Sequence, residues 1–278
     1  MKLLVRTTAE EQMFQERQIG AQRTKYLGAD VLQKIATDDG YRAKVEQLHA
    51  LLDDDKGWIL DVGSNTAGEC EYLVSRGFSV IATDINAVAL SISKERCQRF
   101  GRPSPAYVVC DGQRLPFLNE SVPYVVFDES LHHMPDPAQS LGEVSRVLSQ
   151  HGQVILYEPY AYDPWRRISE IRDYFRGSVE TSFSVRQIKS LLAQVGLRLT
   201  HLSRPVLQPS AWKLEFLSPF RRLLRRSYYK VRQTWPSRFG MILAKADKPA
   251  HVSPHGLVRS ICDVAPDRAT DSAAGGTR

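Results

Sequence analysis

Short apolar runs alternate with longer amphipathic segments between residues 57 and 202. The runs are rich in β-branched and aromatic residues, which predicts strands. The predicted strands are Trp58–Val62, Phe78–Thr83, Ala106–Cys110, Tyr124–Phe127, Val154–Tyr157 and Leu197–Leu202. Helices fit between most of them, so the alternation predicts an α/β fold with a doubly wound, mostly parallel, Rossmann-like sheet and helices on both faces. The run FGMILAKA predicts a last strand, which we expect to be antiparallel.

The helix before the sixth predicted strand has clear signals at both ends. In SVRQIKSLLAQVG, Ser184 and Gln187 have the spacing of a capping box, and Gly196 is a typical C-terminal stop. The apolar positions fall on one face, and they are Ile188, Leu191, Leu192 and Val195. The sequence therefore predicts an amphipathic helix directly after Ser184.

Composition divides the chain into three parts. Residues 1–52 are largely polar and predict an N-terminal helical cover, whereas residues 53–246 contain the alternating strands and helices. A segment at 203–238 breaks this rhythm before the last strand, and we interpret it as an insertion. Residues 247–278 are dominated by Pro, Ser, Ala, Gly and Asp without periodicity, which predicts a disordered tail.

The bulk composition limits the class of protein. A chain of 278 residues with 42% hydrophobic residues can bury a sizeable core. Its four cysteines, at 70, 97, 110 and 261, show no paired spacing, so we expect neither a disulfide framework nor a metal site. No run approaches the roughly 20 apolar residues of a membrane span, and the first apolar run is too short for a signal peptide. We therefore expect a cytoplasmic protein.

The stretch ILDVGSNTAGECEYL at 59–73 predicts a strand, a loop and a helix in succession. Gly63 lets the backbone approach a ligand closely, and the N–H groups that begin the helix favour a carboxylate or a phosphate. Asp61, at the end of the strand, would repel a pyrophosphate and attract an ammonium. A ligand with both a carboxylate and an amine is an amino acid.

Two further acids end the next two predicted strands. Asp84 follows Gly63 by 21 residues, which is where an acid usually binds ribose hydroxyls. Asp111, in VVCDG, is placed to accept a hydrogen bond from an adenine amino group. Amino acid, ribose and adenine together describe S-adenosylmethionine, which we predict as the cofactor.

Five segments of the chain resemble class I S-adenosylmethionine-dependent methyltransferases. The resemblance is to the small-molecule group that includes the ubiquinone and menaquinone C-methyltransferases, known as methyltransferase type 11. The segments occur in family order over about residues 57–202, and they are ILDVGSNTAGE, VIATDIN, CDGQRLPFLNESVPYVVFDESLHHMPDP, VLSQHGQVILYEPY and FSVRQIKSLLAQVGL. Each is weak evidence alone, whereas five in order are strong evidence.

The resemblance implies roles for particular residues. Asp61 and Gly63 would face the methionine part of the cofactor, and Asp84 would bind both ribose hydroxyls. The adenine would be contacted by Ile85, Asp111 and the backbone of Gly112.

The chain departs from the family in the glycine loop. The family usually has glycines where Asn65 and Ala67 stand. Asn65 tolerates a positive φ better than most residues, so we expect it to keep the cofactor turn, and Gly68 offers an alternative register. Asp128, at the end of the fourth strand, is expected to contact the cofactor or the acceptor, or else to cap the segment that follows.

The catalytic candidates lie just past two predicted strands. LHHMPDP places His132 and His133 on the side of the sheet where ligands bind. A histidine titrates near neutral pH and can act as a base, so His133 is a candidate, with packing or capping as the alternative. Glu158, at the end of the fifth strand, is the second catalytic candidate. Together with the aromatic residues after it, Glu158 would line an acceptor pocket, and ordinary packing is the alternative.

The positive charge is concentrated in the insertion. The chain carries a formal charge of +6, but residues 203–238 alone contain nine basic residues and one acid. Within this segment, FRRLLRRSYYKVR at 220–232 has the pattern of a basic amphipathic helix. It suits a lid over the acceptor site, or peripheral contact with an anionic membrane or a lipid-like substrate. Nucleic acid is the least favoured partner, because no RNA-binding module is visible.

We therefore predict methyl transfer to a small or lipid-linked metabolite, at oxygen, carbon or nitrogen. Two other classes stay open. One is a nicotinamide-dependent oxidoreductase on a similar sheet, against which the acid-first loop and Asp111 argue. The other is a methyltransferase-like binding protein without catalysis, which only the departures in the glycine loop favour.

Overall fold

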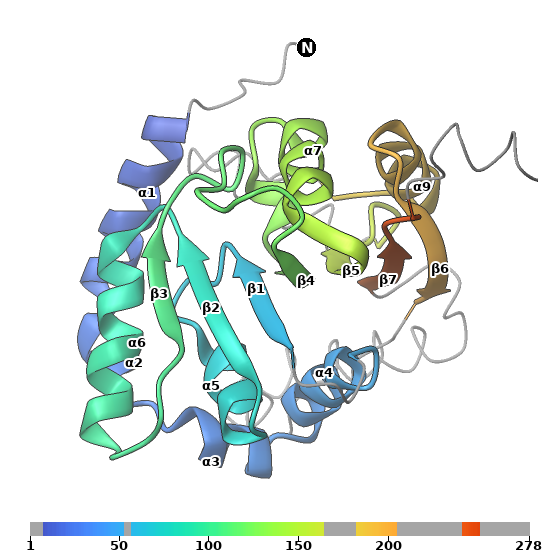
Figure 1. The fold of residues 1–278 in the computed structure, drawn as a ribbon. Coiled ribbons are helices and arrows are strands. Elements are labelled where there is room, and N and C mark those ends of the chain that lie inside the picture. Colours follow the sequence, from blue (N-terminus) through green and yellow to red (C-terminus); the bar gives the residue numbers. More distant parts are fainter. Residues whose placement is uncertain (1–7, 53–56, 164–181, 205–240, 251–278) are drawn as a thin grey trace, which may run out of the picture.

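The computed structural model describes residues 8–52, 57–163, 182–204 and 241–250. Within these ranges, seven strands form one sheet with the order β3-β2-β1-β4-β5-β7-β6 (Figure 1). The strands are β1 (Trp58–Val62), β2 (Ser79–Asp84), β3 (Ala106–Val109), β4 (Val122–Asp128), β5 (Leu148–Pro159), β6 (Arg198–Ser203) and β7 (Met241–Asp247).

The strand directions confirm the predicted fold class. Neighbouring strands from β3 to β5 run parallel, and β7 runs antiparallel to both β5 and β6. The sheet is therefore doubly wound and mostly parallel, with an antiparallel last strand. Its order reverses between β1 and β4, and open α/β sheets bind ligands at the carboxyl ends of the strands beside such a switch point.

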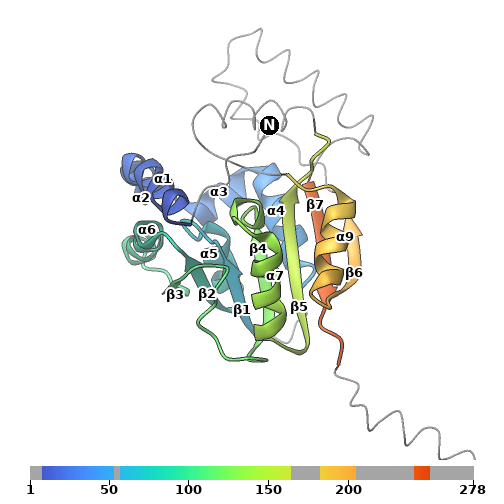
Figure 2. The same cartoon turned by 90° about the horizontal axis from the view of Figure 1, so that it is seen from above.

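Helices cover both faces of the sheet. They are α1 (Thr8–Ala21), α2 (Arg23–Gly28), α3 (Val31–Thr37), α4 (Asp39–His49), α5 (Gly68–Ser75), α6 (Ala87–Arg99), α7 (Pro137–Val147) and α9 (Val185–Gln194), with a short 3-10 helix, η1 (Leu131–His133). Figures 1 and 2 show α7 and α9 on one face of the sheet and α4 and α5 on the other.

The central strand β1 is buried on both faces. Leu60 packs in one cluster with Leu141 of α7 and Ile188 of α9. Ile59 packs in the opposite cluster with Leu73 of α5. Burial on both faces explains why the sequence of this strand is almost uniformly apolar until Asp61.

The N-terminal helices are anchored on α6. Ile19 of α1 is buried against Ala89 and Ile92 of α6. The Arg102 guanidinium, just after α6, donates two hydrogen bonds to the Asp30 carboxylate, at 2.7 and 2.8 Å. The described part of the predicted N-terminal cover is thus helical, and these contacts hold it beside the carboxyl ends of β1 and β2.

The helix α9 begins as the sequence predicts. The Ser184 Oγ accepts from the Gln187 N–H at 3.2 Å, and the Gln187 side chain accepts from the Ser184 N–H at 2.8 Å. Both halves of the capping box are therefore present.

The strand β5 is longer than its apolar run predicts. Pairing with β4 already begins at Leu148, six residues before the predicted start at Val154. The polar residues Ser149–His151 hide this part of the strand from a hydrophobicity pattern, and His151 has a positive φ of 63°.

Two predicted segments lie largely outside the described residues. They are the basic segment 220–232 and the tail at 247–278, of which the structure describes only the first four residues. Among the residues that are described, none of the helices combines the length and the apolar character needed to cross a membrane.

Candidate active site

A cavity of about 630 Å³ opens at the carboxyl ends of β1, β2 and β4 and is walled on its outer side by residues of the N-terminal helices. Most of the residues predicted for the site line it, and they are Gly63, Asn65, Asp84, Ile85, Asp111, Gly112, Asp128 and His133. Asp61 and Glu158 do not line it. The topology therefore brings the ends of separate strands together around one space large enough for a nucleoside-sized ligand.

The loop after β1 has a left-handed backbone at three alternate positions. The φ angles are 76° at Gly63, 50° at Asn65 and 48° at Ala67, whereas Gly68 is not in this region. A Cβ atom at Gly63 would lie 2.7 Å from the Ser130 Cβ, so this position also needs a glycine for space. Asn65 and Ala67 therefore adopt the conformation that glycines provide in the family, and Gly68 does not shift the register.

The backbone at Asn65 gives a testable prediction. Asn65→Gly should bind S-adenosylhomocysteine at least as tightly as the wild type, because glycine adopts a positive φ without strain. Asn65→Val should bind it at least about tenfold more weakly, because a β-branched residue resists this region. Calorimetric titration of the two folded variants measures the difference, and equal affinities would show that the turn does not govern binding.

Asp84 joins the loop to the end of β2. Its Oδ2 accepts from the Asn65 N–H at 2.7 Å, and its Oδ1 accepts from the Asn86 N–H at 2.8 Å. Burial raises the pKa of this carboxyl group, and the backbone N–H donors oppose the rise. Each carboxylate oxygen has a second lone pair, so the group can still accept two hydroxyl hydrogen bonds from the cavity.

Asp61 lies beneath the loop rather than on the cavity wall. Its Oδ2 accepts from the Cys70 thiol at 2.9 Å. Among the described residues, no hydrogen-bond partner reaches its buried Oδ1 or the buried Oγ of Ser64. Burial raises the pKa of Asp61 to about 7, although the Cys70 thiol lowers it somewhat. Two orphaned polar atoms beside the loop fit a ligand that brings hydrogen-bond donors of its own.

Gly112, which the resemblance predicts to contact the adenine, lines the cavity. A Cβ atom at this position would come within 2.8 Å of the Met134 Cε and 3.0 Å of the Val62 Cγ1. The neighbouring Asp111 carboxylate accepts from the Gln113 N–H at 2.9 Å and lines the cavity. A larger residue at this position would require the Met134 side chain to move.

Glu158 supports the segment that carries His133. Glu158 is fully buried, and its carboxylate accepts from the N–H groups of Ser130 at 3.1 Å and Leu131 at 2.8 Å. Its other oxygen lies 2.7 Å from the Nδ1 of His132. Burial raises the pKa of Glu158 to about 8. This geometry suits a positioning residue beneath η1, whereas the predicted candidate His133 lines the cavity.

A buried lysine that the sequence did not indicate lies on the cavity wall. The Nζ of Lys44 in α4 is 2.9 Å from Asp128, 3.1 Å from Glu129 and 3.2 Å from Glu69. Burial by itself would lower the pKa of Lys44, but the carboxylates of Asp128, Glu69 and Glu129 outweigh it and hold the pKa well above its usual value. With three carboxylates around one ammonium, this wall is negative overall.

A comparison with protein families agrees with the fold and the cavity. Residues 60–156 match the family model described as "Methyltransferase domain". Within these residues the chain therefore contains a segment that matches a methyltransferase domain, in agreement with the resemblance of its motifs.

The curated relatives are similar to this chain over part of its length. The chain is 31% identical over 100 residues to a demethylmenaquinone methyltransferase of Streptomyces griseus, which is 36% of this chain and 41% of the relative. It is 33% identical over 104 residues to a ubiquinone/menaquinone biosynthesis C-methyltransferase of Stenotrophomonas maltophilia, and this match also covers 36% of this chain and 41% of the relative. The chain thus spans about two fifths of the length of these relatives.

Solved structures share the fold over a larger part of the chain. One is the geranyl diphosphate C-methyltransferase of Streptomyces coelicolor in complex with Mg²⁺, geranyl diphosphate and S-adenosyl-L-homocysteine. It matches with a TM-score of 0.57 at 20% identity, and the match covers 74% of this chain and 79% of that protein chain. A SAM-dependent methyltransferase of Methanosarcina mazei has a TM-score of 0.53 at 18% identity, with 73% and 97% covered. At these identities the likeness establishes a shared fold.

Proposed function

We propose that this protein transfers the methyl group of S-adenosylmethionine to a small or lipid-linked metabolite, at oxygen, carbon or nitrogen. The observation that carries the proposal is the left-handed loop at Gly63, Asn65 and Ala67, whose backbone is fixed by the Asp84 carboxylate. A loop of this shape and an acid at the end of β2 suit an amino acid joined to a ribose. The cofactor would supply an electrophilic methyl group on a sulfonium.

The cavity residues bind and orient in this proposal. Asp84 holds the ribose hydroxyls, and Ile85, Asp111 and the backbone of Gly112 hold the adenine. The methionine end then lies toward β1 and β4, beside Asp61 and the negative wall around Lys44. Holding two reactants in alignment supplies much of the rate of a displacement reaction.

His133 is the proposed proton acceptor where the acceptor must lose a proton. It lines the cavity from η1, and the buried Glu158 supports η1 from below through the N–H groups of Ser130 and Leu131. His133→Ala should therefore lower kcat for a hydroxyl acceptor and leave the affinity for S-adenosylhomocysteine unchanged.

A screen of acceptors with methyl-labelled S-adenosylmethionine tests the proposed function. Quinols, prenyl diphosphates and small phenols, carboxylates and amines form a suitable set, with vesicle-borne substrates included because the acceptor class contains lipid-linked metabolites. The proposal is supported if the wild type incorporates label into one of these compounds and the Asp84→Ala variant does not. Binding of the cofactor without transfer to any of these compounds would favour the catalytically inactive binding protein.

The burial of Asp61 predicts a pH dependence of cofactor binding. Burial raises its pKa to about 7, and a ligand ammonium on the cavity side of the loop would stabilise the charged carboxylate beneath the loop. Binding below pH 7 must then release a proton, so affinity should fall by up to about tenfold per pH unit as the pH decreases.

Calorimetric titration with S-adenosylhomocysteine between about pH 5.5 and pH 8 measures this slope. The matched variant is Asp61→Asn, which keeps the shape of the side chain without the titration and should show a flatter profile. A wild-type affinity that does not change over this range would count against electrostatic stabilisation of Asp61 by the ammonium.

A further inference from the structure

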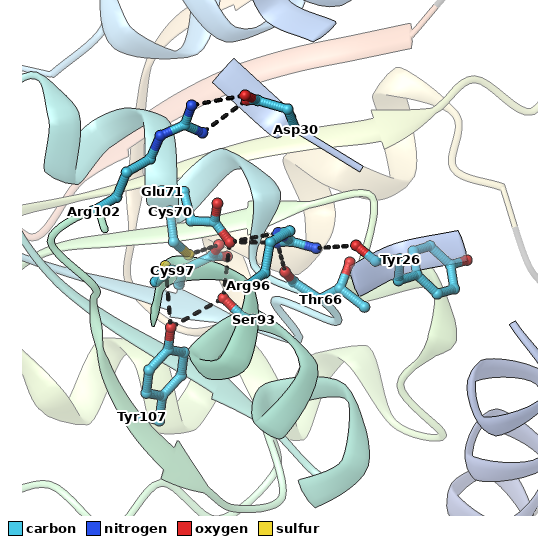
Figure 3. Close-up of polar contacts among 11 residues, drawn as sticks. Tyr26, Asp30, Thr66, Cys70, Glu71, Ser93, Arg96, Cys97, Arg102 and Tyr107 are labelled. Atoms are coloured by element: carbon cyan, nitrogen blue, oxygen red, sulfur yellow. Dashed lines mark hydrogen bonds and ion pairs between the residues drawn. The ribbon is translucent and has the colours of Figure 1, made fainter. Parts of the chain in front are cut away.

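Arg96 is an almost fully buried cation that joins three separate elements at the cavity. It lies in α6 with 1% of its surface exposed, and it also contributes to the cavity wall. Figure 3 shows its guanidinium between Glu71 of α5, Thr66 of the cofactor loop and Tyr26 of α2. The Arg96 side chain has no role in the proposed methyl transfer. Burying a charged guanidinium costs free energy, so its position needs another explanation.

The most informative contact of Arg96 is with the backbone of the cofactor loop. Its Nη2 donates to the Thr66 carbonyl oxygen at 2.5 Å. Thr66 stands between Asn65 and Ala67, and both of these have positive φ. A left-handed backbone is unfavourable for a residue with a Cβ, and for alanine no side-chain hydrogen bond compensates. Such a conformation persists where the surrounding structure fixes it.

The guanidinium is itself held in place from two sides. Its Nε donates to the Glu71 Oε1 at 2.9 Å, and its Nη2 contacts the same oxygen. The Ser93 Oγ also donates to this oxygen at 3.2 Å and lies 3.0 Å from the hydroxyl of Tyr107 in β3 (Figure 3). The orientation of Arg96 is therefore determined by side chains of α5, α6 and β3.

We propose that Arg96 is a positioning residue that holds the cofactor loop in its left-handed turn, in place of the two glycines that the loop lacks. This inference rests on one part of the proposed function, which is that the loop binds the cofactor. The Nη1 of Arg96 also reaches the Tyr26 carbonyl oxygen at 3.5 Å. The same side chain thus connects the loop to the N-terminal helices that wall the cavity.

A double-mutant design separates this role from general stabilisation. Arg96→Met combined with Glu71→Met removes both charges together, so that neither is left buried alone. We expect this variant to bind S-adenosylhomocysteine at least about tenfold more weakly than the wild type. Adding Asn65→Gly and Ala67→Gly to it should restore the affinity to within about threefold, because glycines need no restraint in this turn.

Two further variants keep the test decisive. Arg146→Met with Glu143→Met is the matched control, because Arg146 pairs with Glu143 and donates to the Leu115 and Phe117 carbonyl oxygens outside the cavity. It should leave the affinity within about twofold. If the methionine pair at 96 and 71 does not fold, Arg96→Lys retains a charge beside Glu71 but cannot bridge to Thr66, and it should show the same tenfold loss.

The outcomes distinguish this inference from the proposed function. Wild-type protein that fails to bind S-adenosylhomocysteine would overturn the proposed function itself. Wild-type binding with unchanged affinity in the folded Arg96 variants would overturn only the positioning role. The positioning role also fails if the glycines do not restore binding, or if the Arg146 control loses as much affinity.

Discussion

Asp84→Ala will lower the affinity for S-adenosylhomocysteine by about a hundredfold or more. The carboxylate is proposed to accept two ribose hydroxyl bonds, and hydrogen bonds to a charged group contribute about 1.5–3 kcal/mol each. Even the lower limit gives about 3 kcal/mol for the pair, which is roughly two powers of ten in the dissociation constant. The variant also loses the acceptors of the Asn65 and Asn86 N–H groups, which loosens the loop.

The control for Asp84 is Asp136→Ala. Asp136 caps α7 by accepting from two backbone N–H groups, those of Ala138 and Gln139, so its loss affects stability in a similar way. Asp136 does not line the cavity, and we expect calorimetry to show nearly unchanged affinity. If both variants lost affinity equally, or if Asp84→Ala bound normally while folded, the ribose contact assigned to Asp84 would be wrong.

Lys44→Met will lower the free energy of unfolding by about 3–5 kcal/mol. The substitution leaves Asp128, Glu69 and Glu129 facing one another on the cavity wall without their shared cation, and removing one partner of a buried ion pair has this typical cost. Because only 10% of the Lys44 side chain is exposed, little solvent screening reduces the effect. Urea denaturation of the variant and the wild type, with the midpoint and slope both fitted, measures the loss.

Lys248→Met is the matched control for Lys44. The Lys248 side chain is similarly buried at 12% exposure, but among the described residues its one carboxylate partner is Glu120, which is 37% exposed. We expect a loss of no more than about 1.5 kcal/mol. If the free energy of unfolding fell equally in the two lysine variants, the three carboxylates around Lys44 would add no extra destabilisation when the lysine is removed.

Local patterns were enough to predict the strands and the cofactor loop. Asp61 and Asp84 lie at the ends of β1 and β2, and Gly63 and Asp111 come just after β1 and β3. Since the carboxyl ends of parallel strands meet at one edge of a sheet, the fold alone brings these residues together. The conformation at Ala67 was less accessible, because nothing local shows that alanine would adopt a positive φ there.

Contacts between distant positions account for what the sequence did not indicate. Lys44 reaches Asp128 across 84 positions of the chain, and neither residue belongs to a motif that includes the other. The partner of Arg96 in the loop is a backbone carbonyl oxygen, which every residue has and no sequence pattern distinguishes. Glu158 lies in β5, which continues to Pro159, and its burial beneath η1 depends on how β4 and β5 pack.

Calorimetric titration of the full chain with S-adenosylhomocysteine and, separately, with NADH tests the central claim most directly. The loop, the Asp84 carboxylate and the negative wall around Lys44 predict saturable binding of one S-adenosylhomocysteine per chain and no detectable binding of NADH. Binding of NADH with no binding of S-adenosylhomocysteine would contradict the account and favour the oxidoreductase.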